Sequence, residues 1–410
     1  MPALHGIVGG LAPSEMAETS ALVDPGAREF FPRGDHSAMM KALVAGWSDP
    51  ASTRAWSGVP ARLLPLLEAR GIDVCPVEVR PSRPLVAAAR SLNVVSSYGQ
   101  LWRERRFLRP LLDRRFATAV DACQPDLILH IARAWGSPAG SRRRPAPLEI
   151  LLCDTTWHLM RTFGTALTGL SAAAMRDLEA TERTTLSRMD HIFVLASHVK
   201  DDMADWYGIS PDRISVVGTG PGGATPYMGS KDFAHGHVLF VAKGTHPDKG
   251  ASLLIEAFKA TREQLPDRRL VMVGRDDLVP IARSDPRIEV TGYISRERLQ
   301  RFFESAALFA MTAYNEPLGM VYLEALVTQT PVLGLDRRAL PEITKNGRFG
   351  FLVSDAHPAA VGDALVNALS DPARLALMGR EGQAHVLGSY SWDSMANTIA
   401  TRMIGLAANA

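Results

Sequence analysis

Cysteine, long apolar runs and net charge are all scarce in this sequence. The three cysteines, Cys75, Cys123 and Cys153, are odd in number and far apart, which argues against a disulfide framework or a zinc site. No apolar stretch approaches the roughly 18–20 residues that a membrane span needs. The N-terminus also lacks the basic and apolar regions of a signal peptide. We therefore expect a soluble, cytoplasmic protein.

Positive charge is concentrated in one region, although the net charge is only +2. Residues 51–150 contain 16 arginines, no lysine and eight acidic residues, an excess of eight positive charges. Two interpretations remain open: a solvated arginine-rich face, or peripheral contact with an anionic membrane surface or an acidic acceptor. No recognition motif accompanies the charge, so nucleic acid is not an expected partner.

Short apolar runs alternate with helical segments along most of the 410 residues, which is enough chain for two domains. This alternation predicts an α/β protein with parallel sheets covered by helices on both faces. The glycine-rich segment 218–223 interrupts the pattern and marks a hinge between two such sets. We expect a leader at 1–37, domains at 38–225 and 226–389, and a C-terminal helix at 390–410 that packs back toward the first domain.

Two carboxylates bracket the most informative segment. The apolar run 308–311 predicts a buried strand, a Pro- and Gly-containing turn follows, and 320–327 has the composition of a helix. A helix start presents unpaired N–H groups that suit a phosphate. At about 1.5 Å per residue, Glu316 and Glu324 lie roughly 10–12 Å apart, comparable to a pyrophosphate. A nucleotide sugar fits this span; a capping carboxylate plus an ordinary surface glutamate is the alternative.

This segment resembles the Glu-x7-Glu motif of retaining glycosyltransferases of family 4. The resemblance implies a GT-B fold, in which two Rossmann-like domains with parallel sheets face each other across a cleft. It also implies that Glu316 is catalytic and faces the donor sugar, and that Glu324 bonds the ribose hydroxyls. The backbone that would hold the phosphates belongs to Leu318, Gly319, Met320 and Val321.

A second loop resembles the family's Gly-Arg-Leu-x3-Lys-Gly element, whose two cations neutralise the donor diphosphate. Lys249 matches the lysine, and Lys243 stands where the family usually has arginine, so its contact would be point-like. Gly292 and Tyr293 resemble the element beside the nucleobase, and Arg275 is expected to line the same pocket. Simple packing is the alternative for Tyr293.

Two further elements depart from or vary the family pattern. The loop 335–343 keeps only Pro341-Glu342 of the common Gly-Gly-x-Pro-Glu sequence, which suggests altered sugar selection. Gly58 lies in a Ser-Gly-Val-Pro sequence seen in a subgroup of the family, where it permits close approach to the diphosphate or the acceptor. A plain helix cap, with Ser57 as N-cap and Pro60 in the first turn, is the alternative.

The catalytic residue of the first domain has three candidates. Asp154 follows a predicted strand in a sequence that resembles the subgroup's Thr-Asp-Ala-Thr element, and it could orient the donor sugar or accept a proton from the acceptor. His158 and His130 are the alternatives. The pair Ser197-His198 resembles the family's Ser-x-x-Val element and is expected to be structural.

The resemblance implies a metal-independent, retaining hexosyltransferase. The expected donor is a UDP-sugar, with a GDP-sugar as second choice, and the acceptor is a hydroxyl of a glycan, a lipid-linked molecule or a small molecule. No cofactor is expected. The alternatives are a GT-B epimerase or phosphorylase-like enzyme, and a non-catalytic partner subunit that binds nucleotide sugars. An oxidoreductase is disfavoured because no Gly-x-Gly-x-x-Gly follows the first strand of either set.

Overall fold

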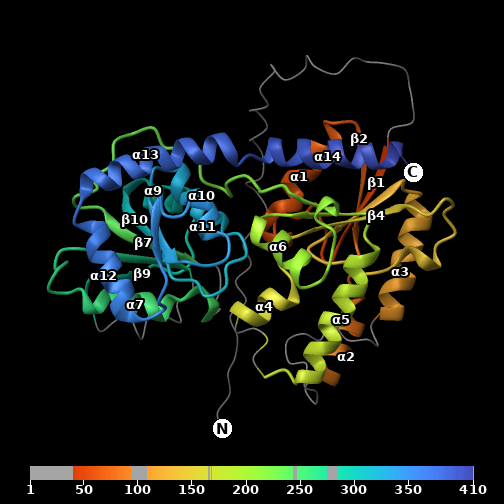
Figure 1. Ribbon diagram of the computed structural model, residues 1–410, viewed down its shortest axis with the longest axis horizontal. Coiled ribbons are helices and arrows are strands. Elements are labelled where there is room, and N and C mark those ends of the chain that lie inside the picture. The colour runs from red at the N-terminus through yellow and green to blue at the C-terminus, as the bar shows by residue number, and fades with distance from the viewer. Residues whose placement is uncertain are drawn as a thin grey trace, which may run out of the picture. The chain divides into compact units, whose positions relative to one another are not determined.

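The computed structural model describes residues 40–93, 109–164, 167, 169–242, 247–274, 282 and 285–409. Within them the chain forms two six-stranded sheets, and every strand pairing is parallel (Figure 1). The predicted α/β class is therefore confirmed. Lys243 and Arg275 lie outside the described residues.

The first sheet has the strand order β2-β1-β3-β4-β5-β6. Its strands are β1 (Met40–Gly46), β2 (Ile72–Glu78), β3 (Leu127–Ile131), β4 (Leu148–Cys153), β5 (His191–Val194) and β6 (Ile214–Val216). The helices of this half are α1 (Val59–Glu68), α2 (Arg83–Asn93), α3 (Arg109–Cys123), α4 (Trp157–Phe163), α5 (Ala172–Arg188) and α6 (Ser197–Asp205).

The second sheet has the strand order β12-β11-β10-β7-β8-β9. Its strands are β7 (His237–Ala242), β8 (Leu270–Gly274), β9 (Ile288–Val290), β10 (Ala306–Met311), β11 (Val332–Leu335) and β12 (Gly350–Val353). The helices are α7 (Ala251–Ala260), α9 (Arg296–Ser305), α10 (Met320–Val327), α11 (Leu340–Ile343), α12 (Pro358–Leu369) and α13 (Pro372–Ser389).

The central strands are apolar on both faces because helices cover both sides of a parallel sheet. Every residue of β3 and of β10 is buried. The carboxyl ends of parallel strands meet at one edge, and ligands of such sheets bind in the loops at that edge. The loops that follow β7, β10 and β11 are therefore brought together, as are those that follow β3 and β4.

The last helix, α14 (Trp392–Ala408), packs against α1 of the first half (Figure 1). Arg70 Nη2 donates to Asp393 Oδ1 over 2.6 Å, and Trp392 Nε1 donates to the Pro221 carbonyl over 3.0 Å. The C-terminal segment thus contacts the first half and the glycine-rich connection. None of the described helices has the length and apolarity needed to cross a membrane.

Candidate active site

The loop after β7 lies directly against the end of β10. Gly250 has a φ of +69°, and a Cβ built on it would stand 1.8 Å from the Thr312 carbonyl oxygen, so only glycine fits. Thr312 Oγ1 donates to the Gly250 carbonyl over 2.7 Å, and the Tyr314 amide donates to the Asp248 carbonyl over 2.6 Å. These contacts place Lys249 beside the segment that begins at Tyr314.

Lys249 and Glu316 form an ion pair between Lys249 Nζ and Glu316 Oε2. Their side chains remain 25% and 19% exposed, so both can be reached by a ligand. The other oxygen of Glu316, Oε1, accepts from the Gly319 amide over 3.0 Å. Glu316 thus acts as a capping carboxylate for the start of α10, which agrees with the alternative interpretation of this residue. It also pairs with Lys249 of the neighbouring loop.

Helix α10 begins where the sequence predicted. Gly319 is its N-cap with a φ of +77°, and Leu318 beside it is buried. Because the Gly319 amide already donates to Glu316, the amides of Met320 and Val321 are the ones left without an intrahelical acceptor. Both residues line the pocket described next.

A pocket of about 610 Å³ joins the two predicted carboxylates; we call it the Glu316 pocket. Glu324 lines it, and Glu324 Oε1 accepts from the Gly223 amide over 2.5 Å, which fixes the glycine-rich connection at its wall. Two cations that sequence reasoning missed, Arg62 and Arg296, also line it. The residues shared with the prediction are Lys249, Glu316, Gly319, Met320, Val321 and Glu324.

Gly58 lies beside the Glu316 pocket rather than on its wall; its neighbours Ser57 and Arg62 line it. Gly58, with a φ of +79°, is itself the N-cap of α1 and Pro60 lies in the first turn. The alternative with Ser57 as N-cap is wrong, because Ser57 has a φ of +59° and no capping bond.

The predicted base-binding element is placed only in part. Gly292 has a φ of +69°, and its carbonyl accepts from the Gly274 amide over 3.1 Å. Tyr293 is 70% exposed, so it does not belong to the buried core. Neither residue lines the Glu316 pocket, whereas the next residue, Ile294, does. Contact with a base stays a prediction.

Asp154 follows β4, within electrostatic reach of Glu316 from the other half of the chain. Burial raises the pKa of Asp154, while Arg133 and Arg338 oppose the shift and Glu316 adds to it. Asp154 is not among the residues that line the Glu316 pocket, so its role in the site stays a prediction. That role, to orient hydroxyls or accept a proton, suits a carboxylate.

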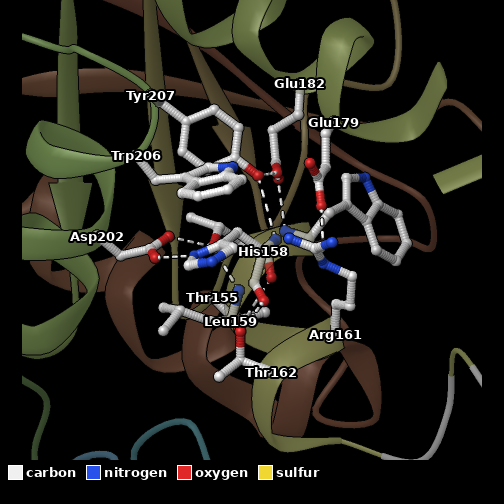
Figure 2. Close-up of polar contacts among 12 residues, drawn as sticks. Thr155, His158, Leu159, Arg161, Thr162, Glu179, Glu182, Asp202, Trp206 and Tyr207 are labelled. Atoms are coloured by element: carbon white, nitrogen blue, oxygen red, sulfur yellow. Dashed lines mark hydrogen bonds and ion pairs between the residues drawn. The ribbon is translucent and has the colours of Figure 1, made fainter. Parts of the chain in front are cut away.

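His158 is held rigidly at the start of α4. Its Nδ1 is 2.5 Å from Asp202 Oδ1, and the second oxygen of Asp202 accepts from Thr156 Oγ1 over 2.5 Å. The ring stacks on Trp206 with centroids 4.0 Å apart and 8° between the planes (Figure 2). The His158 amide lies 3.2 Å from the Tyr207 hydroxyl, which bonds Glu182. Asp202 was not foreseen, since nothing near it in sequence marks it.

His130 is not a site residue, which corrects the third candidate. Its side chain is fully buried, Nε2 contacts Glu149 Oε2 at 3.0 Å, and the ring stacks on Phe116. Burial lowers the pKa of His130. A ligand cannot reach this imidazole, so it serves the packing between β3 and α3.

Two contacts connect the loops after β11 and β4 and the start of α6. Glu342 Oε2 accepts from the Ser197 amide over 2.8 Å and from Ser197 Oγ over 2.6 Å. Arg338 Nη2 donates to Thr155 Oγ1 over 2.8 Å. Glu342 of the loop 335–343, which keeps the Pro-Glu of the family sequence, therefore holds the start of α6.

Among the residues the structure describes, no three His, Cys, Asp or Glu side chains lie close enough together to form a metal site.

Two family descriptions match the chain over separate ranges. "Glycosyltransferase Family 4" matches residues 60–220, and "Glycosyl transferases group 1" matches residues 235–371. The first range lies in the half built on β1–β6 and the second in the half built on β7–β12. Both halves are therefore covered by glycosyltransferase families.

The chain is also similar in sequence or in structure to individual glycosyltransferases and related proteins. The D-inositol 3-phosphate glycosyltransferase of Corynebacterium efficiens is 29% identical over 241 residues, 52% of this chain and 56% of that protein. The chain spans about half the length of such curated relatives. Sucrose-phosphate synthase from Thermosynechococcus elongatus has a TM-score of 0.68 at 18% identity, over 91% of this chain and all of that one. Anabaena HepE, solved with UDP and glucose, scores 0.61 at 14% identity over 89% of this chain and all of that one. The predicted GT-B fold is confirmed.

Proposed function

Since the chain belongs to the glycosyltransferases of family 4, we propose that it transfers a sugar from a nucleoside diphosphate sugar to a hydroxyl acceptor, with retention of configuration. The observation that carries this proposal is the Glu316 pocket. It combines Glu316, Glu324 and Lys249 with the N-terminus of α10 around one volume of about 610 Å³. A donor-sized ligand fills pockets of this size.

The donor diphosphate would lie at the amides of Met320 and Val321, where the helix dipole favours negative charge. Lys249, Arg62 and Arg296 line the same pocket and would neutralise the charge that grows on the leaving diphosphate. These cations supply the role that a divalent ion has in other transferases, so we propose a metal-independent reaction.

Glu324 would bond the ribose hydroxyls, and Glu316 would face the sugar. Binding of the diphosphate would draw Lys249 away from Glu316 Oε2 and leave that oxygen for a sugar hydroxyl. The ion pair thus holds both groups in place. A phosphate has more negative charge than one carboxylate, which favours this exchange of partners.

In the reaction, the bond between the anomeric carbon and the diphosphate oxygen breaks, and the acceptor oxygen bonds the same face of that carbon. The acceptor's proton passes to the leaving phosphate. Asp154 stands near enough to Glu316 and Arg338 for electrostatic coupling, and would orient the sugar from the opposite side. Its carboxylate form is the one that accepts hydroxyl hydrogens.

The first test is a panel of nucleotide sugars scored by thermal stabilisation, since a ligand that binds the folded state raises its melting temperature. HepE was solved with UDP, so UDP and UDP-glucose are the first probes, followed by their GDP counterparts. We expect one nucleotide family to stabilise the protein and its sugar to be transferred when a hydroxyl acceptor is added.

The test also separates the rival functions. Conversion of the donor's sugar without an acceptor would indicate an epimerase, and donor binding without any turnover would indicate a non-catalytic partner subunit. If no nucleoside diphosphate or nucleotide sugar raised the melting temperature, the proposed function would be wrong.

A further inference from the structure

A second pocket, of about 380 Å³, shares no lining residue with the Glu316 pocket and includes Arg338, on which Asp154 acts electrostatically; we call it the Arg338 pocket. Seven of its lining residues come from α4, α6 and the residue after α6, and one comes from the loop after β11. These residues are His158, Leu159, Phe163, His198, Asp202, Asp205, Trp206 and Arg338. The pocket is therefore mostly a feature of the first half of the chain, closed by one arginine of the second.

Arg338 is an unusual residue for a loop. It is 7% exposed, and its φ of +58° lies in the left-handed region that favours glycine. Its Nη2 donates to Thr155 Oγ1, but Nε and Nη1 are buried without an acceptor among the described residues. Burying the donors of a cation without an acceptor destabilises the folded protein. A bound ligand would remove that destabilisation.

The charges around Arg338 indicate which kind of ligand oxygen its unpaired N–H groups would bind. Asp154, Asp202 and Glu316 all act electrostatically on the guanidinium, so its positive charge already has counter-charges. Burial lowers the pKa of Arg338 to about 10, which keeps it charged at neutral pH. A further oxyanion would meet three carboxylates at this position. Neutral oxygens, such as hydroxyls, satisfy the free N–H groups without that repulsion.

Two more lining groups fit a polyhydroxyl ring. Both ring nitrogens of His198 are buried without a partner among the described residues, and burial beside Arg338 lowers the pKa of His198 to about 3. The imidazole is thus neutral and offers one donor and one acceptor. Trp206 is 42% exposed, and its indole is fixed parallel to His158, which Asp202 holds (Figure 2). An exposed, rigid aromatic surface suits the C–H face of a ring.

We propose that the Arg338 pocket is the acceptor subsite, and that it binds a neutral polyhydroxyl ring, a pyranose or a cyclitol. Arg338 and His198 bond its hydroxyl oxygens, and Trp206 contacts its apolar face. This inference rests on the proposed function, because only a transferase needs an acceptor here. It assigns a specificity-determining role to Arg338, which stands in the loop that departs from the family's glycine-rich pattern.

The test measures ring binding directly by saturation-transfer NMR, with myo-inositol and methyl α-D-glucopyranoside as probes and a saturating nucleoside diphosphate present. We expect at least one probe to bind the wild-type protein. Arg338→Gly tolerates the left-handed backbone but removes the donors, and should weaken that binding about 10-fold or more. Trp206→Ala should weaken it as well, and this exposed position decides the question if Arg338→Gly does not fold.

Lys345→Gly is the matched control, because Lys345 is also a cation with positive φ (+50°) but is exposed and lies outside the pocket. It should bind the ring probe like the wild type. The assignment is overturned if no neutral ring binds the wild type, if inorganic phosphate binds in its place, or if neither pocket substitution weakens ring binding.

Calorimetry with the nucleotide and its nucleotide sugar separates this inference from the proposed function. Arg338→Gly should bind the nucleotide as the wild type does, because Arg338 does not line the Glu316 pocket. If the variant instead loses only the added affinity of the nucleotide sugar over the nucleotide, Arg338 contacts the donor sugar and the acceptor assignment is wrong. If the wild type binds neither, the proposed function itself fails.

Discussion

Lys249 Nζ pairs with Glu316 Oε2, although the two residues lie on different loops, after β7 and β10. The close approach of Gly250 to Thr312 places them together. One residue of the pair is expected to bind the diphosphate and the other the sugar. The fold therefore places these two residues of the proposed donor site next to each other.

Replacing Lys249 by glutamine should weaken binding of the nucleoside diphosphate. A charged hydrogen bond contributes about 1.5–3 kcal/mol, so the dissociation constant should rise about 10- to 100-fold. Isothermal calorimetry measures this, with Lys345→Gln as the control because that lysine is exposed and lies outside the pocket. Unchanged affinity in Lys249→Gln would remove Lys249 from the donor site.

Glu324→Ala should also weaken nucleotide binding, because it removes the carboxylate expected to bond the ribose hydroxyls. It further releases the Gly223 amide, which Glu324 now holds at 2.5 Å. We expect a loss of about 10-fold or more for the nucleoside diphosphate. Inorganic pyrophosphate, which lacks a ribose, is the control ligand and should lose little affinity. Equal losses for both ligands would argue against the ribose assignment.

Gly250→Ala tests the loop that positions Lys249. A methyl group would stand 1.8 Å from the Thr312 carbonyl oxygen, so the loop must move. We expect a lower melting temperature and weaker nucleotide binding. Gly388→Ala in α13 is the matched control: nothing lies within 4 Å of its Cβ position, and alanine favours a helix by about 1 kcal/mol. If Gly250→Ala were as stable as the wild type, the close approach would be wrong.

Stability should fall as the solution is acidified from pH 6.5 toward 4. Burial lowers the pKa of His237 to about 4, with Arg269 and Lys231 adding to the shift. Between the two pKa values the unfolded chain binds a proton that the folded chain does not, so the free energy of unfolding decreases as pH falls. Urea unfolding at pH 7 and pH 5 measures this. His237→Gln should show a smaller decrease than the wild type; an equal decrease would contradict the assignment.

The sequence predicted those features that depend on local residues. Helix α10 was predicted at 320–327, because a turn before it and an apolar helical composition mark its start and end. The strands of both sheets are predicted from short apolar runs, because such runs are stable only when they are buried. The helices α12 and α13 are not among the predicted elements, although His357-Pro358 and Asp371-Pro372 give them a side-chain cap and a proline in the first turn.

The parts that escaped prediction depend on contacts between distant residues. Arg62 and Glu324 are 262 positions apart in sequence, yet both line the Glu316 pocket. Asp202 holds His158 from another helix, and the burial of Arg338 depends on Thr155 and Phe163 in the other half. His130 shows the reverse case: its place at a strand end suggested a site residue, but packing against Phe116 buries it.

The role of Glu316 is tested by comparing Glu316→Gln with the wild type in both turnover and nucleotide binding. Glutamine keeps the size of the side chain but cannot carry the charge that faces the sugar. We expect a loss of transfer of at least about 100-fold, as for other groups that act in the transition state. Affinity for the nucleoside diphosphate should stay within about threefold, less than 1 kcal/mol. Preserved turnover with the donor that the wild type uses would show that Glu316 does not have the proposed sugar-facing role.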